Sequence, residues 1–301
     1  MNSRGHNLVI RAEVIRSIRH FFELNGFLEI ETPLRIPANA PEEHIDPAHA
    51  GRQYLQTSPE ICMKRLLCRG HKKFFQISHC WRSNERGRRH LPEFTMLEWY
   101  RADSCYNQLM NDCGELLAHI AQDHHCLKGM PYQGQQIRPA APAERITVRE
   151  AFRRYSAREM DATLADGSFD ECMVTEIEPG LPWDHPVFLT DYPVEHAALA
   201  RVKQQDSTVA ERFELYLGGL ELANGFSELN DPVEQRARFM EANRRREARD
   251  MPPLPLPEPF LEELGSMPAS AGIALGIDRL VMLFCDTTDI DSVVAFTPEE
   301  L

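Results

Sequence analysis

The chain has 301 residues, 43% of them hydrophobic, which is enough to bury a full core in one large domain or two smaller ones. Its 33 basic and 46 acidic side chains give a formal net charge of −13, which argues against extensive contact with a nucleic-acid backbone, although a local basic patch can still form. No apolar run approaches the roughly 18 residues that span a bilayer, and residues 1–6 lack the apolar core of a secretory signal. We therefore expect a cytoplasmic protein with no membrane contact.

The eight cysteines include no C-x-x-C pair, and their spacing fits neither a zinc site nor a compact disulfide framework. We expect reduced thiols, most of them buried. Asp123, His124, His125 and Cys126 follow one another, but adjacent residues on a helix point in different directions. We therefore expect no metal site there.

The first elements follow from apolar spacing and end signals. Residues 8–25 predict a helix that ends at Asn25-Gly26, and residues 27–32 predict a strand. Residues 59–67 predict a second helix with Thr57-Ser58 as its cap and Pro59 at its first position. Glu60 is therefore expected at a helix N-terminus.

A charged loop lies between strands predicted over residues 74–78 and 94–100. Residues 82–90 contain four arginines, a glycine and a histidine, and apolar segments flank them on both sides. Such a loop suits a polyphosphate, because guanidinium groups bind phosphate oxygens in pairs. Taken alone, the stretch is equally compatible with a solvated hairpin.

In the rest of the chain, segments with a clear secondary-structure pattern alternate with segments without one. Residues 106–123 predict a helix, 127–145 a loop or short hairpin, and 186–193 a buried strand, whereas 146–180 show no clear pattern. Residues 231–250 predict a helix whose run of arginines at 244–246 favours a solvated face. Residues 251–259, with five prolines, predict an extended connector. Glu214 and Glu221 are seven apart, which suits neighbouring strands joined at Gly218-Gly219.

Several separated segments, in this order, resemble the class II aminoacyl-tRNA synthetases, and most closely the lysyl-tRNA synthetases. Residues 26–33 resemble motif 1, 81–100 resemble motif 2, 212–216 and 221–229 resemble the lysine-site strands, and 271–280 resemble motif 3. The resemblance implies an α+β fold, with an antiparallel sheet flanked by helices, in one catalytic domain over residues 1–301. It also implies a homodimer formed through residues 8–35.

The resemblance assigns the ATP-binding charges. It implies that Arg82 lies between the α-phosphate and the substrate carboxylate, and that Arg279 lies over the adenine and γ-phosphate. Glu214 and Glu221 match the carboxylates that bind Mg²⁺. Hard oxygen ligands that link Mg²⁺ to substrate phosphates are a common arrangement.

The resemblance also assigns the nucleotide contacts of motif 2. Phe94 would stack on the adenine, and His90 would lie near the phosphates. Where the family has Arg-x-Glu, this chain has Asn84 in the third position and Glu85 one place later. Either of the two is a candidate for the adenine contact.

The predicted amino-acid pocket is acidic. By resemblance, Glu98, Tyr100 and Glu228 hold the ε-ammonium of lysine. A buried ammonium is tolerated only when it is paired and hydrogen-bonded, so several carboxylates around it make physical sense. Three further contacts are implied, to the amino group, the carboxylate and the stem of the substrate: Glu60, Asn224 and Phe226.

Two features separate the chain from lysyl-tRNA synthetases. Motif 1 begins at Gly26, so we expect no large anticodon-reading domain before it. Ala274 stands where those enzymes have glycine, and its methyl group is expected to shape the floor of the pocket in favour of β-lysine. In both respects the chain resembles the elongation factor P (R)-β-lysine ligases, which implies activation of (R)-β-lysine or lysine with ATP and transfer to a lysine of elongation factor P.

Two alternatives remain at this stage. One is a lysine-tRNA ligase-like enzyme that charges tRNA or a small molecule, with tRNA disfavoured by the net charge. The other is a non-catalytic regulatory paralogue, against which the intact pairs Arg82 with Arg279 and Glu214 with Glu221 argue.

Overall fold

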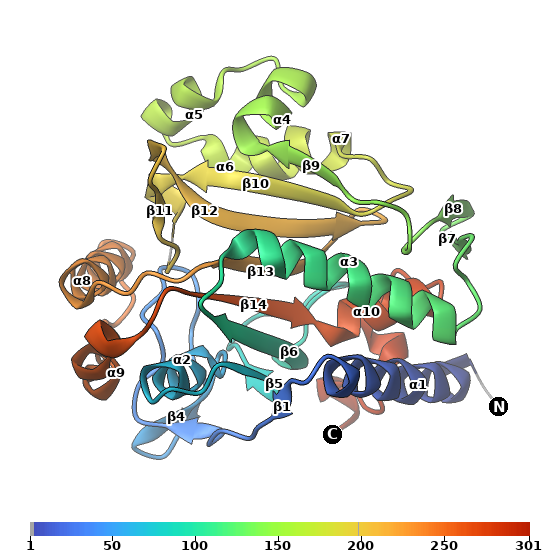
Figure 1. The fold of residues 1–301 in the computed structure, drawn as a ribbon, viewed down its shortest axis with the longest axis horizontal. Coiled ribbons are helices and arrows are strands. Elements are labelled where there is room, and N and C mark those ends of the chain that lie inside the picture. Colours follow the sequence, from blue (N-terminus) through green and yellow to red (C-terminus); the bar gives the residue numbers. More distant parts are fainter. Residues whose placement is uncertain (1–2, 198) are drawn as a thin grey trace.

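A central mixed sheet organises the molecule, which a computed structural model describes over residues 3–197 and 199–301 (Figure 1). The spatial order is β1-β5-β6-β14-β13-β12-β10-β9, with β11 paired to β12. All neighbours are antiparallel except the two outermost pairs, β1 with β5 and β9 with β10. The strands are β1 (Leu28–Glu29), β5 (Lys73–Trp81), β6 (Glu93–Ala102), β9 (Glu144–Thr147), β10 (Val187–Pro193), β11 (Val202–Lys203), β12 (Asp206–Leu217), β13 (Leu220–Ser227) and β14 (Ser270–Gly276). The predicted α+β fold, an antiparallel sheet flanked by helices, is confirmed.

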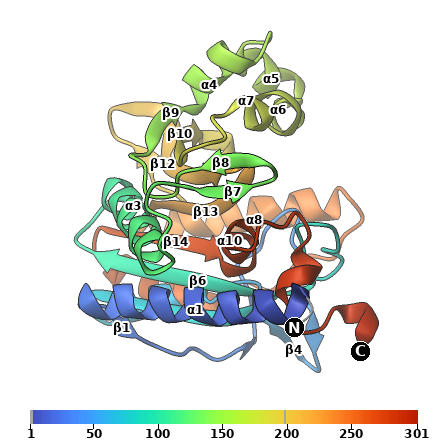
Figure 2. The same ribbon diagram turned by 90° about the vertical axis from the view of Figure 1, so that its right-hand side faces the viewer.

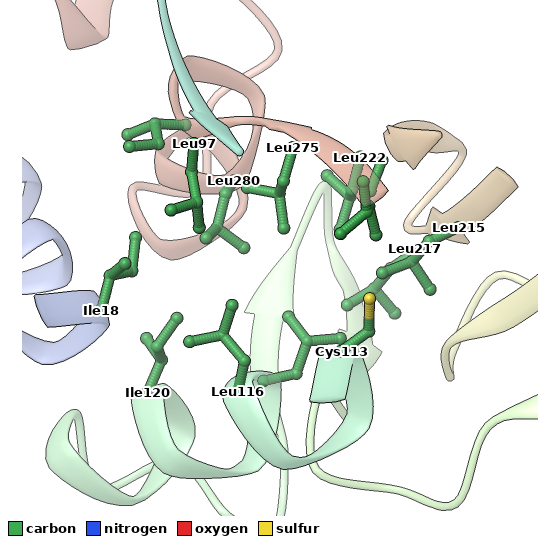
Figure 3. Close-up of a cluster of buried hydrophobic side chains, with 14 of the residues drawn as sticks. Ile18, Leu97, Cys113, Leu116, Ile120, Leu215, Leu217, Leu222, Leu275 and Leu280 are labelled. Atoms are coloured by element: carbon green, nitrogen blue, oxygen red, sulfur yellow. The ribbon is translucent and has the colours of Figure 1, made fainter. Parts of the chain in front are cut away.

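Three helices cover one face of this sheet: α1 (Ser3–Leu24), α3 (Tyr106–Asp123) and α10 (Ile277–Phe284). Apolar side chains from the helices and the strands meet in the main core, as Figure 3 shows for Ile18, Leu116, Leu275 and Leu280. Helix α3 has the bounds that apolar spacing predicted. Helix α1 begins earlier than predicted, because its first turn is polar and carries no apolar signal.

The opposite side of the strands carries shorter elements, and Figure 2 shows α3 and α8 on different sides of the sheet. These elements are α2 (Glu60–Cys68), α8 (Pro232–Glu247), α9 (Glu258–Glu263) and a small sheet of β2 (Arg35–Ile36), β3 (His49–Ala50) and β4 (Gln53–Leu55). Asp231 caps α8, because its carboxylate accepts hydrogen bonds from the N–H groups of Val233 and Glu234. The extended connector predicted over 251–259 is present over residues 251–257, because α9 begins at Glu258.

Residues 146–180, which gave no clear pattern, fold into short helices beyond the β9–β10 edge (Figure 1). They are α4 (Val148–Tyr155), α5 (Met160–Asp166), α6 (Phe169–Cys172), a π-helical turn (Met173–Ile177) and α7 (Glu178–Gly180). Their apolar side chains form a second core with β9 and β10. The hairpin predicted within 127–145 is present as β7 (Met130–Tyr132) and β8 (Gln135–Ile137).

Three local predictions need correction. The strand predicted over 27–32 is only two residues long, because β1 pairs with β5 over that length alone. Pro59 lies at the N-cap of α2 rather than at its first position, and Ser58 Oγ accepts a hydrogen bond from the Glu60 N–H at 3.0 Å. The cysteines are free, but only Cys80, Cys113 and Cys172 are buried, so the expectation of mostly buried thiols is wrong.

The prediction of a solvated arginine face on α8 is wrong for Arg246. This side chain is buried and donates to the carbonyls of Glu42, Ile45 and Pro252 at 2.9 to 3.1 Å, and to Asp46 Oδ1 at 2.6 Å. Its partners lie about 200 residues away or beyond the end of the helix, so helical periodicity could not reveal them.

No helix among residues 3–197 and 199–301 combines the length and the apolar character needed to cross a membrane.

Candidate active site

The site is built on the sheet face that lies opposite α1 and α3. One row of paired residues crosses β6, β14, β13 and β12: Glu98, Ala274, Asn224 and Glu214. The adjacent row is Tyr100, Gly272, Phe226 and Arg212. Since side chains alternate along a strand, both rows face the same side, whereas residues at the alternate positions, such as Leu97 and Leu275, face the main core (Figure 3).

A β-bulge aligns the two halves of β13. The ladder shifts between Leu215 and Tyr216, so that Tyr216 pairs with Glu221 and Leu222 becomes an extra residue. In a regular strand Glu221 and Asn224, three residues apart, would face opposite sides. The bulge therefore brings a predicted metal ligand and a predicted substrate ligand to one face.

A cavity of about 1820 Å³ lies over this face. Most of the predicted site residues line it: Glu60, Arg82, Glu85, His90, Phe94, Glu98, Tyr100, Glu221, Asn224, Phe226, Ala274 and Arg279. Asn84 does not; it is exposed in the turn with φ 66°, so Glu85 is the better placed of the two adenine candidates. Glu214 and Glu228 are buried and do not line the cavity.

Lys64 of α2 sits between two of the predicted amino-acid ligands. Its Nζ lies 3.1 Å from Glu60 Oε2, 2.9 Å from Glu228 Oε2 and 4.9 Å from the centre of the Phe226 ring. Burial opposes the charge of Lys64, but Glu228 and Glu60 outweigh burial and hold the pKa of this ammonium above its ordinary value. The amino-acid end of the site thus contains an internal ammonium that the sequence analysis did not identify.

Glu228 is nearly inaccessible, with a side chain 1% exposed. Burial raises its pKa to about 7, although Lys64 acts in the opposite direction. Neither carboxylate oxygen accepts a hydrogen bond of good geometry from residues 3–197 or 199–301. Acceptor capacity is therefore left at the place where the resemblance puts the substrate ammonium.

Glu98 is held between two hydroxyl groups at the floor of the cavity. Ser58 Oγ donates to Oε1 at 2.5 Å and Tyr100 Oη donates to Oε2 at 2.9 Å. Burial, with a contribution from Glu60, raises the pKa of Glu98 to about 8. A cation bound beside Glu98 would lower this pKa again.

Backbone space is tightly limited beside these acids. A Cβ atom added to Gly272 would lie 2.2 Å from Tyr100 Cε1 and 2.4 Å from Glu228 Oε1. The position therefore requires glycine for close approach rather than for a special φ. Two residues along β14, Ala274 adds one methyl group to the floor between Asn224 and Glu98.

The other end of the cavity carries two arginines on different elements. Arg82 Nε is buried and donates to no acceptor in the described part of the chain, and the guanidinium lies 5.1 Å from the centre of the Phe94 ring. Arg279 donates to the Glu221 carbonyl at 2.9 Å and lies 2.6 Å from His90 Nε2. Burial and the charge of Arg279 lower the pKa of His90, which favours a neutral ring that accepts this bond.

Three carboxylates gather beside these arginines: Glu178, Glu214 and Glu221. Burial, Glu214 and Glu221 raise the pKa of Glu178 to about 7, and burial with Glu214 also raises that of Glu221. This mutual repulsion and the all-oxygen donor set fit a bound Mg²⁺, which would relieve the repulsion. Glu214 already accepts hydrogen bonds at 2.6 Å from Arg212, Tyr192 and Tyr216. Within the described part of the chain the Glu221 carboxylate accepts one, from Arg279 at 3.2 Å, so Glu221 has the freer oxygens.

The sequence analysis missed several charged residues of the site: Glu42, Lys64, Glu178 and Arg212. The signal for Lys64 was present, because it follows Glu60 by four residues on one helix. Glu178 belongs to the segment without a clear pattern, and its position beside β12 depends on tertiary packing that the local sequence does not indicate.

Comparison with known proteins agrees with this geometry. Residues 2–300 match the model of the family described as tRNA synthetases class II (D, K and N). The chain belongs to this class II synthetase family. Among its relatives are proteins named elongation factor P–(R)-β-lysine ligase from Erwinia tasmaniensis, 38% identical over 97% of this chain and 94% of the relative, and from Pectobacterium carotovorum, 39% identical over 97% and 95%. A third, from Proteus mirabilis, is 38% identical over 96% and 94%. This class II synthetase-like chain therefore shares nearly its full length with enzymes that are ligases.

Proposed function

We propose that the chain activates (R)-β-lysine, or lysine, with ATP and transfers it to a lysine side chain of elongation factor P. The observation that carries the proposal is the division of one cavity into an arginine-rich end and a buried acidic end, on the face of a class II synthetase sheet. The names of the relatives supply the acceptor protein.

The reaction has two steps. A carboxylate oxygen of the amino acid attacks the α-phosphorus of ATP, the bond from that phosphorus to the bridging oxygen breaks, and pyrophosphate leaves. The uncharged amine of the acceptor lysine then attacks the carbonyl carbon, the carbon–oxygen bond to AMP breaks, and the nitrogen loses a proton.

In the first step Arg82 and Arg279 would neutralise the phosphates and orient the attacking carboxylate. His90 would keep Arg279 in place through its neutral ring. Glu221 and Glu214 would hold Mg²⁺, which when bound supplies charge to the phosphate oxygens. In this view the chain binds and orients its substrates and needs no covalent nucleophile of its own.

At the acidic end, Glu98, Tyr100 and Glu228 would receive the terminal ammonium of the substrate, with Glu60 near its second amino group and Phe226 along its stem. Such a site discriminates strongly, because a neutral isostere would leave the buried acids unpaired. The geometry agrees with a diamino acid better than with a neutral amino acid.

We also propose a homodimer formed through residues 8–35. Four large apolar side chains of this region are substantially exposed: Val9, Leu24, Leu28 and Leu34. Sedimentation of the purified protein should give twice the chain mass, and a monomer would contradict this assignment. Because the acceptor is a translation factor, we place the reaction in the cytoplasm.

ATP–pyrophosphate exchange tests the first step. Exchange should depend on (R)-β-lysine or α-lysine and should be absent with leucine. Exchange that needs no diamino acid, or that leucine supports equally well, would contradict the proposed substrate class.

A further inference from the structure

Residues 37–47 cross the cavity rim as a loop held in a fixed position. Buried Arg246 binds the carbonyl of Glu42 at 3.1 Å and that of Ile45 at 2.9 Å. Asn39, also buried, donates to the Leu55 carbonyl at 3.2 Å and accepts from the Thr57 N–H at 2.8 Å. These bonds fix the backbone on both sides of Glu42, which lines the cavity.

The carboxylate of Glu42 differs from the other acids around it because it has no partner. Among residues 3–197 and 199–301 it makes neither a hydrogen bond nor an ion pair. By contrast, Glu60 is paired with Lys64, and Glu98 accepts from Ser58 and Tyr100. The adjacent Glu43 is also paired, with Arg249 at 2.8 Å and Arg245 at 3.4 Å.

The charges around Glu42 locate it within the site. Burial and the charge of Glu60 raise its pKa to about 7, whereas Arg82, Lys64 and Arg212 act in the opposite direction. Glu42 is thus within electrostatic reach of Glu60, the predicted amino contact, and of Arg82, the predicted carboxylate contact. Glu42, Glu60 and Arg82 line the same cavity.

We propose that Glu42 is a specificity-determining residue that binds the second ammonium of the substrate, the one nearer the reacting carboxylate. The inference rests on the proposed function and extends it, because it assigns each ammonium of a six-carbon diamino acid to its own acids. Glu98, Tyr100 and Glu228 receive the terminal group, and Glu42 with Glu60 receives the inner one. The carboxylate of Glu42 lines the cavity and makes no hydrogen bond or ion pair within the described part of the chain, so its oxygens are available to such a cation.

Three ligands of equal chain length allow binding at the two ends of the pocket to be tested separately. (R)-β-lysine and α-lysine carry both ammonium groups, and 6-aminohexanoic acid carries only the terminal one. Calorimetric titration would compare their Kd values for the wild-type protein, Glu42→Gln and the matched control Glu43→Gln. Thermal unfolding of each variant checks the fold.

In Glu42→Gln we expect the Kd of both diamino acids to rise about 10- to 100-fold, the range of a hydrogen bond to a charged group. The Kd of 6-aminohexanoic acid should stay within about twofold, since it lacks the group that Glu42 binds. Glu43→Gln should leave all three values within about twofold, because Glu43 already pairs with arginines away from the proposed substrate groups.

Equal weakening of all three amino acids, or no weakening of the diamino acids, would overturn the assignment of Glu42. Wild-type ATP–pyrophosphate exchange with (R)-β-lysine is measured separately. If wild-type exchange is present and either of these binding results is found, the role of Glu42 is contradicted but the proposed function stands. If wild-type exchange is absent, the proposed function itself is contradicted.

Discussion

The two ends of the cavity differ in the charge and the burial of their side chains. At the phosphate end the charged side chains are partly open to solvent, with exposed fractions of 26% for Arg82 and 21% for Arg279. At the amino-acid end the acids are buried, with 1% for Glu228, and their pKa values are raised. Guanidinium groups stay charged in either setting, whereas carboxylates must be kept ionised by a cation.

The difference indicates how the acidic end is held together before substrate binds. Lys64 supplies one permanent ammonium to Glu60 and Glu228, while Glu98 and Glu42 are able to remain protonated near neutral pH. Binding a diamino acid at this end would therefore release protons.

The substitution Lys64→Met is expected to have the largest effect, which is on the stability of the fold. This change leaves Glu60 and Glu228 buried without their cation, so the free energy of unfolding at pH 8 should fall by about 3 to 5 kcal/mol. Denaturant unfolding measures it, and Glu228→Gln added to Lys64→Met should recover part of the loss. The control Lys72→Met removes an exposed lysine and should change stability by less than about 0.5 kcal/mol. Equal, small changes in both variants would show that Lys64 does not support the acidic end.

At the phosphate end, Glu221→Gln should lower the rate of pyrophosphate exchange by about 100- to 1000-fold while the fold stays intact. The physical reason is the loss of an accessible metal ligand, and excess EDTA should have a similar effect on the wild-type protein. Glu150→Gln, an exposed glutamate on α4, is the matched control. Exchange that survives either treatment is incompatible with a Mg²⁺ site at Glu221.

The acidic end should also make stability depend on pH. The pKa of Glu98 is about 8 when folded against an ordinary 4.5, so the folded state binds more protons between these values. The stabilisation is complete below about pH 4.5 and is lost as pH rises to about 8, at up to about 1.4 kcal/mol per pH unit for this group. Glu98→Gln should flatten the dependence of the free energy of unfolding on pH between about pH 5 and 8. Parallel curves for the two proteins would mean that Glu98 is ionised throughout.

The smallest expected effect concerns one methyl group. Ala274→Gly should raise kcat/KM for α-lysine relative to (R)-β-lysine by about 10-fold, because it opens the floor between Asn224 and Glu98. Pyrophosphate exchange with both amino acids gives the ratio, and Ala157→Gly at an exposed position serves as control. An unchanged ratio would place the selectivity elsewhere in the pocket.

Much of the fold and the phosphate end could be predicted from sequence. Apolar patterns predicted α3, β5, β6 and β10, and the family resemblance predicted β12 and β13. The motif residues Arg82 and Arg279 line one cavity. The β-bulge at Leu222 could not be predicted, because it is a one-residue shift in the pairing of β13 with β12 and the amino-acid composition of the strand does not indicate it. The short helices over 146–180 have too few turns to show a period.

The acidic end was predicted incompletely for a similar reason. Burial, which raises the pKa of Glu98 and Glu228, is a property of the packed sheet and not of any segment. Arg246 shows this most clearly: its run of arginines favoured a solvated face, yet it is buried under the loop that carries Glu42. Among the residues that the sequence analysis missed at this end, Lys64 was open to recognition from the sequence, because it follows Glu60 by four residues on α2.

The most direct test of the account is the transfer step itself. Purified protein, ATP, Mg²⁺ and (R)-β-lysine should be incubated with elongation factor P or, in parallel, with lysine tRNA, and each acceptor analysed for covalent lysine. We predict that elongation factor P gains one lysyl group on a lysine side chain and that tRNA is charged far more slowly. Charging of tRNA at a comparable or faster rate, or modification of neither acceptor, would contradict the account.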